Sequence, residues 1–286
     1  MDVGGHDLEG REFRNADEMW RVETGEDGSK SQWYGSAIRY WEKVEATIDG
    51  VLGGYADVND ADIAASHAFL NSIFSERFPT LRDVSRPSSH LVALDCGSGI
   101  GRVTKNLLLR YFNEVDLLEP VPHFLEAARV SLAPENLIAP DMHKAANFIC
   151  VPLQDFTPAA GRYDVIWIQW CISQLADDDF IAFFKRARTG LKPGGLFILK
   201  ENIARQGFVL DNKDKSITRS DKYFKELFLK CGLYLYKTKD QTGFPAGLLG
   251  VKMYALSTEM PKFKRSFERK SKRLSNRPAI ISSFTR

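Results

Sequence analysis

Three closely spaced glycines form the part of the chain best suited to holding a small ligand. The segment "LDCGSGIGRVTKNLL" places Gly97, Gly99 and Gly101 between an apolar run and a helical pattern. Glycines at such a turn let the backbone approach a ligand closely at the carboxyl end of a strand. The spacing is GxGxG, whereas dinucleotide-binding folds prefer GxGxxG, and Asp95 precedes the first glycine by two residues. An acid at that place suits a cationic ligand better than a phosphate.

A second acid follows at the end of the next apolar run. Glu119 lies 22 residues after Gly97, about where such folds place a carboxylate for ribose hydroxyls. The two acids and the glycine loop therefore predict a ligand that contains a nucleoside but no phosphate. A tight turn is the common explanation of a single glycine, but it explains three glycines in this setting poorly.

The elements that must position these residues alternate between apolar strands and helical segments. The strand candidates are residues 91–95, 114–119, 147–153, 163–169 and 195–201. Near-continuous apolar strands separated by helices indicate a parallel sheet covered on both faces. A helical pattern at 220–232 then precedes two more strand candidates, 233–238 and 251–256, which would add an antiparallel edge. The sequence thus predicts an α/β fold with a doubly wound, mostly parallel seven-stranded sheet.

Two helices are expected before this sheet. Ile38, Trp41, Val44 and Ile48 recur at helical spacing, and a second helix begins after Asp60. We expect residues 1–30 to form a flexible N-terminal segment, residues 31–258 to form one domain, and residues 259–286 to form a basic, disordered tail.

Composition and charge narrow the class of protein. The net charge is +2, but residues 261–286 carry nine Lys or Arg against the single Glu268, so the body is acidic. The simplest interpretation of such a tail is a solvated extension. A more specific hypothesis is that the tail directs nuclear import or contacts nucleic acid weakly. No apolar run is long enough for a membrane helix, and the start lacks the apolar region of a signal peptide. We expect a cytoplasmic or nuclear protein, or one found in both compartments.

The cysteines and histidines give no metal-binding pattern. Cys96, Cys150, Cys171 and Cys231 are widely separated, and the five histidines are equally scattered. We interpret the cysteines as reduced core residues and predict no metal site.

In the order of these motifs, the chain resembles the class I S-adenosylmethionine-dependent methyltransferases. The glycine loop, the acid that ends the second strand, "LQDF" after the third strand and "LKPGG" before the fifth all follow that family's order. The resemblance implies S-adenosyl-L-methionine as cofactor and a Rossmann-like fold. It implies that the amino-acid end of the cofactor contacts Gly97, Gly99, Gly101 and Arg102, that Glu119 holds the ribose, and that Leu153 and Gln154 border the adenine. Without the neighbouring motifs, a loop or helix cap would explain Gln154 equally well.

A narrower resemblance is to the protein α-N-terminal methyltransferases, which methylate the exposed amine of proteins beginning X-Pro-Lys. Its motifs are "RYWEKVEATIDGVLGGY", "LDCGSGIGRVTKNLLL", "LQDFTP", "YDVIWIQW" and "KENIARQGFVLDNKD", within residues 33–256. It implies that Gln169 contacts the cofactor and that Trp41, Trp170 and Asn202 line the acceptor tunnel, with Tyr40 nearby. Leu52 and Gly53 would border the peptide. Asp211 and Asp214 would engage the substrate's lysine and help to deprotonate its amine.

The chemistry of the residues agrees with this resemblance in part. An α-amine has a pKa of about 7.7 to 8.0 and attacks a sulfonium methyl only when neutral, so a nearby carboxylate is useful. Aromatic walls orient an amine and tolerate its cationic product. The simpler interpretations are a core aromatic for Trp170 and an ordinary polar loop for "LDNKDKS".

One position departs from the family's pattern. The family usually has a histidine four residues after the tunnel tryptophan, and this chain has Gln174 there. A glutamine orients an amine by hydrogen bonding but does not take its proton near neutral pH. The catalytic base would then be Asp214 or water.

The hypothesis from the sequence is an enzyme that methylates the α-amino group of proteins with an X-Pro-Lys-type N-terminus. One alternative is a methyltransferase that acts on a small-molecule amine or another protein site. Another is a cofactor-binding homologue weakened by the loss of the histidine. We expect a monomer without membrane contact, and the position of the basic residues in the tail argues against nucleic acid at the site.

Overall fold

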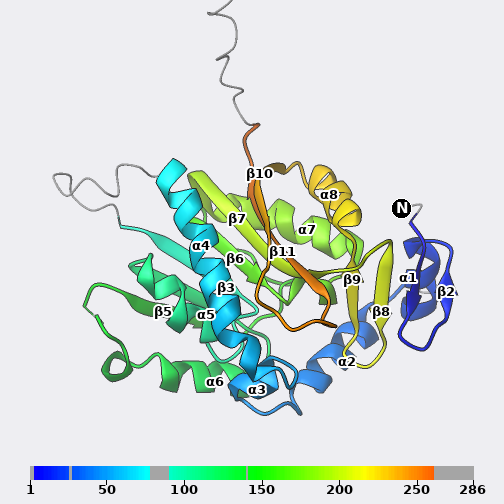
Figure 1. Ribbon diagram of the computed structural model, residues 1–286, viewed down its shortest axis with the longest axis horizontal. Coiled ribbons are helices and arrows are strands. Elements are labelled where there is room, and N and C mark those ends of the chain that lie inside the picture. The colour runs from blue at the N-terminus through cyan, green and yellow to red at the C-terminus, as the bar shows by residue number, and fades with distance from the viewer. Residues whose placement is uncertain (1–2, 26–27, 78–89, 140, 261–286) are drawn as a thin grey trace, which may run out of the picture.

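The computed structural model describes residues 3–25, 28–77, 90–139 and 141–260. Its centre is a seven-stranded sheet in the order β10-β11-β7-β6-β3-β4-β5 (Figure 1). The predicted α/β fold with a doubly wound, mostly parallel seven-stranded sheet is confirmed. The predicted tail lies almost wholly outside the described residues.

Five strands of this sheet pair in parallel, and two more join its edge through antiparallel pairing. The parallel strands are β3 (Val92–Cys96), β4 (Glu114–Leu118), β5 (Lys144–Ile149), β6 (Tyr163–Gln169) and β7 (Leu191–Ile203). The edge consists of β10 (Tyr234–Asp240) and β11 (Gly250–Ser257), with β11 paired to β7. Strand β5 begins and ends earlier than predicted, so the apolar residues after it form a loop at the carboxyl end of the sheet.

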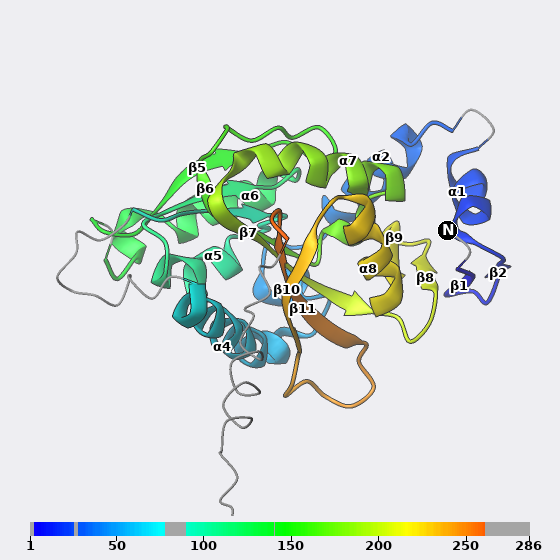
Figure 2. The ribbon, with the colours of Figure 1, turned by 90° about the horizontal axis from the view of Figure 1, so that it is seen from above.

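Helices cover both faces of the sheet (Figures 1 and 2). On one face α4 (Asn59–Arg77), α5 (Arg102–Asn106) and α6 (Pro122–Ser131) share a core with the sheet; this core includes Phe69 and Leu70 of α4. On the other face α7 (Asp177–Ala187) and α8 (Asp221–Lys230) form a second core rich in phenylalanine. Short 3-10 turns complete the connections: η1 (Ala56–Val58), η3 (Leu108–Arg110), η4 (Pro134–Asn136), η5 (Ile172–Gln174) and η6 (Arg188–Gly190).

The first predicted helix is broken in two. Helix α2 (Ser31–Trp41) ends before Val44, and α3 (Ile48–Val51) begins anew with Thr47, whose hydroxyl accepts from the Gly50 amide at 3.0 Å. The chain turns back so closely there that a Cβ on Gly50 would lie 2.2 Å from the Glu45 carbonyl oxygen.

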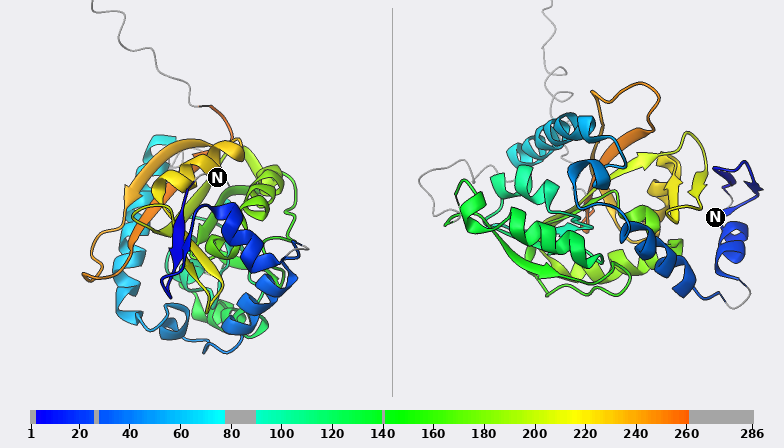
Figure 3. Two further views of the ribbon diagram at one scale, coloured as in Figure 1. Left: turned by 90° about the vertical axis from the view of Figure 1, so that its right-hand side faces the viewer. Right: turned by 90° about the horizontal axis from the view of Figure 1, so that it is seen from below.

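Residues 1–30 were predicted to be a flexible segment, and the structure differs. Strands β1 (Gly5–Asp7) and β2 (Glu12–Phe13) join β8 (Phe208–Asp211) and β9 (Ser216–Arg219) in a second sheet, ordered β2-β1-β8-β9. Helix α1 (Ala16–Thr24) follows beside it (Figure 3). Phe13, Ala16 and Met19 are buried in the larger core, which holds this segment in place. Strands of two and three residues are too short for an alternating pattern to reveal them.

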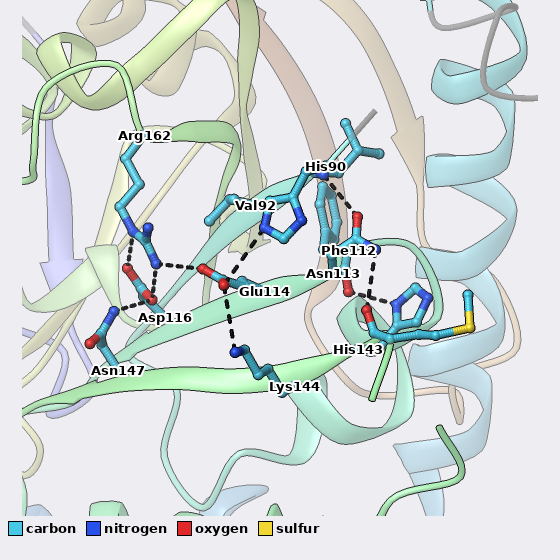
Figure 4. Close-up of polar contacts among 12 residues, drawn as sticks. His90, Val92, Phe112, Asn113, Glu114, Asp116, His143, Lys144, Asn147 and Arg162 are labelled. Atoms are coloured by element: carbon cyan, nitrogen blue, oxygen red, sulfur yellow. Dashed lines mark hydrogen bonds and ion pairs between the residues drawn. The ribbon is translucent and has the colours of Figure 1, made fainter. Parts of the chain in front are cut away.

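A polar cluster links the amino ends of the strands (Figure 4). The Arg162 guanidinium contacts the carboxylates of Asp116, with Nε 2.7 Å from Oδ2, and Glu114, with Nη2 3.1 Å from Oε2. Ligands of such folds bind at the opposite, carboxyl ends of the strands, so we assign this cluster to stability. None of the helices in the described part of the chain is long and apolar enough to span a membrane.

Candidate functional site

A pocket that is open to solvent lies at the carboxyl ends of β3, β4 and β6. Its walls come from α2, the glycine loop, the end of β4, the loop after β5, and the segment from β6 to η5. Many of the residues singled out in the sequence meet there: Trp41, Gly97, Gly99, Arg102, Glu119, Leu153, Gln154, Gln169, Trp170 and Gln174. Carboxyl ends of parallel strands share one edge of a sheet, which explains why distant motifs converge.

The glycine loop adopts a backbone that other residues rarely adopt. Gly97, Gly99 and Gly101 have φ values of 63°, 52° and 75°. A Cβ on Gly97 would lie 2.3 Å from the Cβ of Cys171, so the loop packs tightly against the end of β6. Gly101 does not line the pocket: a Cβ there would lie 2.8 Å from a methyl carbon of Leu132. Its role in this structure is close packing, while Gly97 and Gly99 face the pocket.

Glu119 is fixed to the glycine loop by hydrogen bonds. Its Oε2 accepts from the Gly99 amide at 2.8 Å, and its Oε1 accepts from the Val121 amide at 2.9 Å. Burial raises the pKa of Glu119 to about 7, although these two amides oppose the rise. A carboxylate has about four acceptor sites, so two remain for the hydroxyls of a ligand.

Asp95 is a second buried carboxyl group at the pocket. Its Oδ2 accepts from the Thr104 hydroxyl at 2.6 Å, and burial raises its pKa to about 6. Ser98, in the same loop, has a buried hydroxyl without a partner among the described residues. A cationic ligand with polar groups would stabilise the ionised Asp95 and satisfy Ser98, and S-adenosylmethionine has both features.

Asp62 is central to the site and was not among the residues that the sequence singled out. It lies fully buried on α4 and accepts from Arg102 Nη1 at 2.8 Å. Its carboxylate also pairs with the buried ammonium of Lys200 and accepts from the amide of Gln169. The signal available was a charged residue on the apolar face of a helix, at helical spacing from Phe69 and Ile73.

Gln169 faces the pocket but is already engaged within the protein. Its Nε2 donates to Asp62, and its Oε1 accepts from Trp167 Nε1 at 3.0 Å. The side chain therefore has a fixed orientation before any ligand binds.

Aromatic side chains contribute to the wall of the pocket. The rings of Trp41 and Phe124 meet edge to face with centroids 6.5 Å apart. Trp170, directly after β6, has a φ of 52°, and its ring lies 5.7 Å from the Arg102 guanidinium carbon. Its Nε1 is buried without a partner in the described ranges. Trp170 is thus a half-buried wall rather than a residue of the central core.

Gln174 lies at the end of η5 beside this wall. Its main-chain carbonyl accepts from Trp33 Nε1 at 2.7 Å, and its side chain lines the pocket. The carboxamide can both donate and accept hydrogen bonds to a ligand in the pocket.

The remaining residues singled out in the sequence lie outside the lining of this pocket. They are Tyr40, Leu52, Gly53, Asn202, Asp211 and Asp214. Gly53 is exposed, and Asn202 sits near the end of β7, paired with Val251 of β11. Tyr40 lies in a neighbouring hollow with Lys213.

The two aspartates of the β8–β9 loop lie near Tyr40. Burial, and then the charges of Asp214 and Asp211, raise the pKa of Tyr40. Burial also raises the pKa of Asp214, which accepts from Ser216. Asp214 Oδ1 is buried without a partner in the part of the chain that the structure describes. A buried, unpartnered carboxylate oxygen is a ready acceptor for a cation.

Glu201 is another acid that the sequence did not single out. It is buried on β7, and burial raises its pKa to about 8, although the amides of Ile172 and Ser173 oppose the rise. Its neighbour Lys200 points to the other face of the sheet, toward Asp62. No group of three or more potential metal ligands occurs among the residues that were described.

Comparisons with known proteins agree with this geometry. Residues 29–257 match a family model described as "AdoMet dependent proline di-methyltransferase". The chain is 60% identical over 284 residues to "Alpha N-terminal protein methyltransferase 1" of Arabidopsis thaliana, covering 98% of this chain and all of that protein. It is 37% identical over 227 residues to "N-terminal Xaa-Pro-Lys N-methyltransferase 1-B" of Xenopus laevis, covering 79% of this chain and 96% of that protein.

A solved structure has the same fold. A SAM-dependent methyltransferase of Leishmania major is 39% identical, with a TM-score of 0.77, and the match covers 90% of this chain and 97% of that chain.

Proposed function

The chain belongs to the AdoMet-dependent proline di-methyltransferase family, and we propose that it methylates the α-amino group of proteins that begin Xaa-Pro-Lys. The cofactor in this proposal is S-adenosyl-L-methionine. The observation that carries it is one pocket lined by a glycine loop, by the buried acids Asp95 and Glu119, and by the aromatic side chains of Trp41 and Trp170.

The pocket residues fit the proposed cofactor. Glu119 has acceptor sites free for ribose hydroxyls, burial raises the pKa of Asp95 to about 6, and the buried Ser98 hydroxyl has no partner among the described residues. Arg102 offers a cation for a carboxylate, and Leu153 and Gln154 offer a border for a base. When bound, S-adenosylmethionine supplies a methyl carbon activated by a sulfonium.

The chain's own contribution is to position a neutral amine and to remove its proton. Trp41 and Trp170 would orient the amine toward the bound cofactor, and such orientation supplies a large share of the rate enhancement. The cofactor would supply the methyl group and would be left as the neutral thioether. The ammonium proton must leave before the nitrogen can attack.

Asp214 is the group that we propose to bind the α-ammonium of the peptide and then to accept its proton, directly or through water. Its raised pKa and unpartnered oxygen suit a base, whereas Gln174 offers only hydrogen bonds. We further propose that Asp211 engages the peptide's lysine, and that Tyr40, Leu52, Gly53 and Asn202 border the peptide. The monomeric state and the cytoplasmic or nuclear location remain predictions.

The test is methylation of a synthetic Xaa-Pro-Lys peptide, followed by mass spectrometry. The purified full chain with S-adenosylmethionine should add methyl mass to the free peptide and none to the same peptide acetylated at its amine. Methylation of the acetylated peptide would contradict the α-amine assignment. Tight cofactor binding without any mass gain would instead support the weakened, cofactor-binding homologue.

A further inference from the structure

The loop between β8 and β9 has charges that could cancel one another. Residues 211–215 read "DNKDK", so Lys213 and Lys215 flank Asp214. Opposite charges about 4 Å apart near a protein surface attract each other strongly enough to form an ion pair. A lysine of the loop that paired with Asp214 would therefore occupy the carboxylate that we propose for the substrate's cation.

Neither lysine takes that place in the structure. Lys215 Nζ lies 2.8 Å from Glu23 Oε2, 3.3 Å from Asn212 Oδ1 and 5.4 Å from the centroid of the Trp33 ring. Lys213 Nζ lies 5.9 Å from the centroid of the Tyr40 ring. The ion pairs found in the described ranges include neither Asp211 nor Asp214, and Asp214 Oδ1 has no partner there.

Glu23 is well placed to hold Lys215 because α1 is firmly docked. The side chains of Glu23 and Lys215 are 12% and 22% exposed, so water screens their attraction only in part. Trp20 of α1 packs edge to face on Trp33 with ring centroids 5.0 Å apart, and Met19 is fully buried.

The segment before α1 is tied to the same loop. Strand β1 pairs in parallel with β8, and the Leu8 amide donates to the Leu210 carbonyl at 3.0 Å. The Asn212 amide contacts the carboxylates of Asp7 at 3.3 Å and Glu9 at 3.1 Å. The β8–β9 loop is thus held from its outer side by residues 5–23, which precede residue 29, where the family match begins.

We propose that Glu23 is a positioning residue for peptide binding: it holds the Lys215 ammonium on the outer side of the β8–β9 loop, which keeps the Asp214 carboxylate available to a cationic peptide. The inference rests on the proposed function for the identity of that cation. Without the Glu23 charge, the flexible Lys215 side chain is released to pair with the carboxylate of Asp214, its neighbour in the sequence.

The kinetic test uses the full chain and a charge-neutral substitution. Glu23→Gln should raise the KM for an Xaa-Pro-Lys peptide about fivefold and leave the Kd for S-adenosylmethionine unchanged. Lys215→Gln in the same background should return the KM to the wild-type value, because no lysine remains to compete. Glu18→Gln is the matched control, since it removes a charge from the same helix whose ion pair, among the described residues, is with the exposed Arg14. If the double variant keeps the high KM, Glu23 has only a structural role and the proposal is wrong.

A second measurement does not depend on activity. A carbon-13 NMR titration of the Asp214 carboxyl group should show a lower pKa in Glu23→Gln than in wild type, and a return to the wild-type pKa when Lys215→Gln is added. An unchanged Asp214 pKa in Glu23→Gln would overturn the proposal whether or not the protein methylates the peptide. A shifted pKa in a protein that methylates no Xaa-Pro-Lys peptide would leave the role of Glu23 standing and contradict the proposed function instead.

Discussion

The side-chain amide of Gln169 donates to both carboxylate oxygens of Asp62, at 2.9 Å to Oδ1 and 3.0 Å to Oδ2. The same carboxylate pairs with Arg102 and Lys200, so one buried anion is the counter-charge of two buried cations. Arg102 and Gln169 line the pocket, whereas Asp62 does not. The orientation of the Arg102 and Gln169 side chains therefore depends on Asp62 of α4, which does not itself line the pocket.

Removing the charge of Asp62 should weaken both the fold and cofactor binding. Asp62→Asn leaves Arg102 and Lys200 buried without a counter-charge, and breaking a buried pair of this kind costs about 3 to 5 kcal/mol. Urea denaturation should show that loss, and calorimetry should show a raised Kd for S-adenosylmethionine. Asp60→Asn, on the exposed side of the same helix, should change the free energy of unfolding by less than about 0.5 kcal/mol. Equal effects of the two substitutions would contradict the role given to Asp62.

The cofactor-free protein should lose stability as the pH rises from about 5 to 8. Burial raises the pKa values of Asp95, Glu119 and Glu201 to about 6, 7 and 8. Over this range the folded protein holds protons that the unfolded chain has released, so unfolding becomes easier with each step in pH. Each group contributes a slope of up to about 1.4 kcal/mol per pH unit within its own range.

Denaturation at several pH values measures that slope, and Glu201→Gln provides the comparison. The amide does not titrate, so the slope between pH 5 and 8 should become shallower in this variant. A slope identical to that of wild type would show that Glu201 titrates in its ordinary range.

The proposed role of Asp214 as the base predicts that removing its carboxylate lowers the rate of methylation and that a new imidazole at position 174 restores part of that rate. Asp214→Asn should lower kcat for the Xaa-Pro-Lys peptide about 100-fold and flatten the rise of rate with pH, because the amide accepts no proton. Adding Gln174→His supplies an imidazole with a pKa of about 6.5 and should restore part of the rate above that pH. Asp211→Asn is the control from the same loop, expected to raise the peptide's KM with little change in kcat. A full rate in Asp214→Asn would exclude it as the base.

The docking of the N-terminal strand can be tested at a single glycine. A Cβ on Gly207 would lie 1.8 Å from the Gly4 carbonyl oxygen, so Gly207→Ala must push the start of β1 away from β8. Gly10→Ala carries a similar backbone penalty, since both residues have positive φ, but its Cβ would meet no atom within 4 Å. Gly207→Ala should therefore lower the melting temperature further than Gly10→Ala and increase proteolysis within residues 1–25. Equal melting temperatures would contradict the close approach of β1.

The pocket was predictable where the sequence marks the ends of strands. The glycine loop, Glu119 and Trp170 each follow an apolar run, and the geometry of a parallel sheet brings such positions together. Asp62 was not predictable in the same way, because its partners lie 40 and 138 residues away and no local pattern links them.

The N-terminal segment shows a second limit of sequence patterns. His6 and Glu12 look like loop residues, and the segment is held by contacts distant in sequence: the pairing of β1 with β8 and the burial of Phe13 and Met19 in the larger core. The position of Asp214 was marked by resemblance to a family, whereas the direction in which Lys215 points depends on Glu23, which is distant in sequence.

Trp170 keeps a backbone conformation that suits glycine or asparagine better than a bulky residue. An L-residue pays roughly 1 to 2 kcal/mol for such a conformation, and glycine would relieve it. A screen for thermal stability alone would therefore favour small residues at this position. A screen for methyl transfer would favour the tryptophan, so the two selections should diverge at position 170.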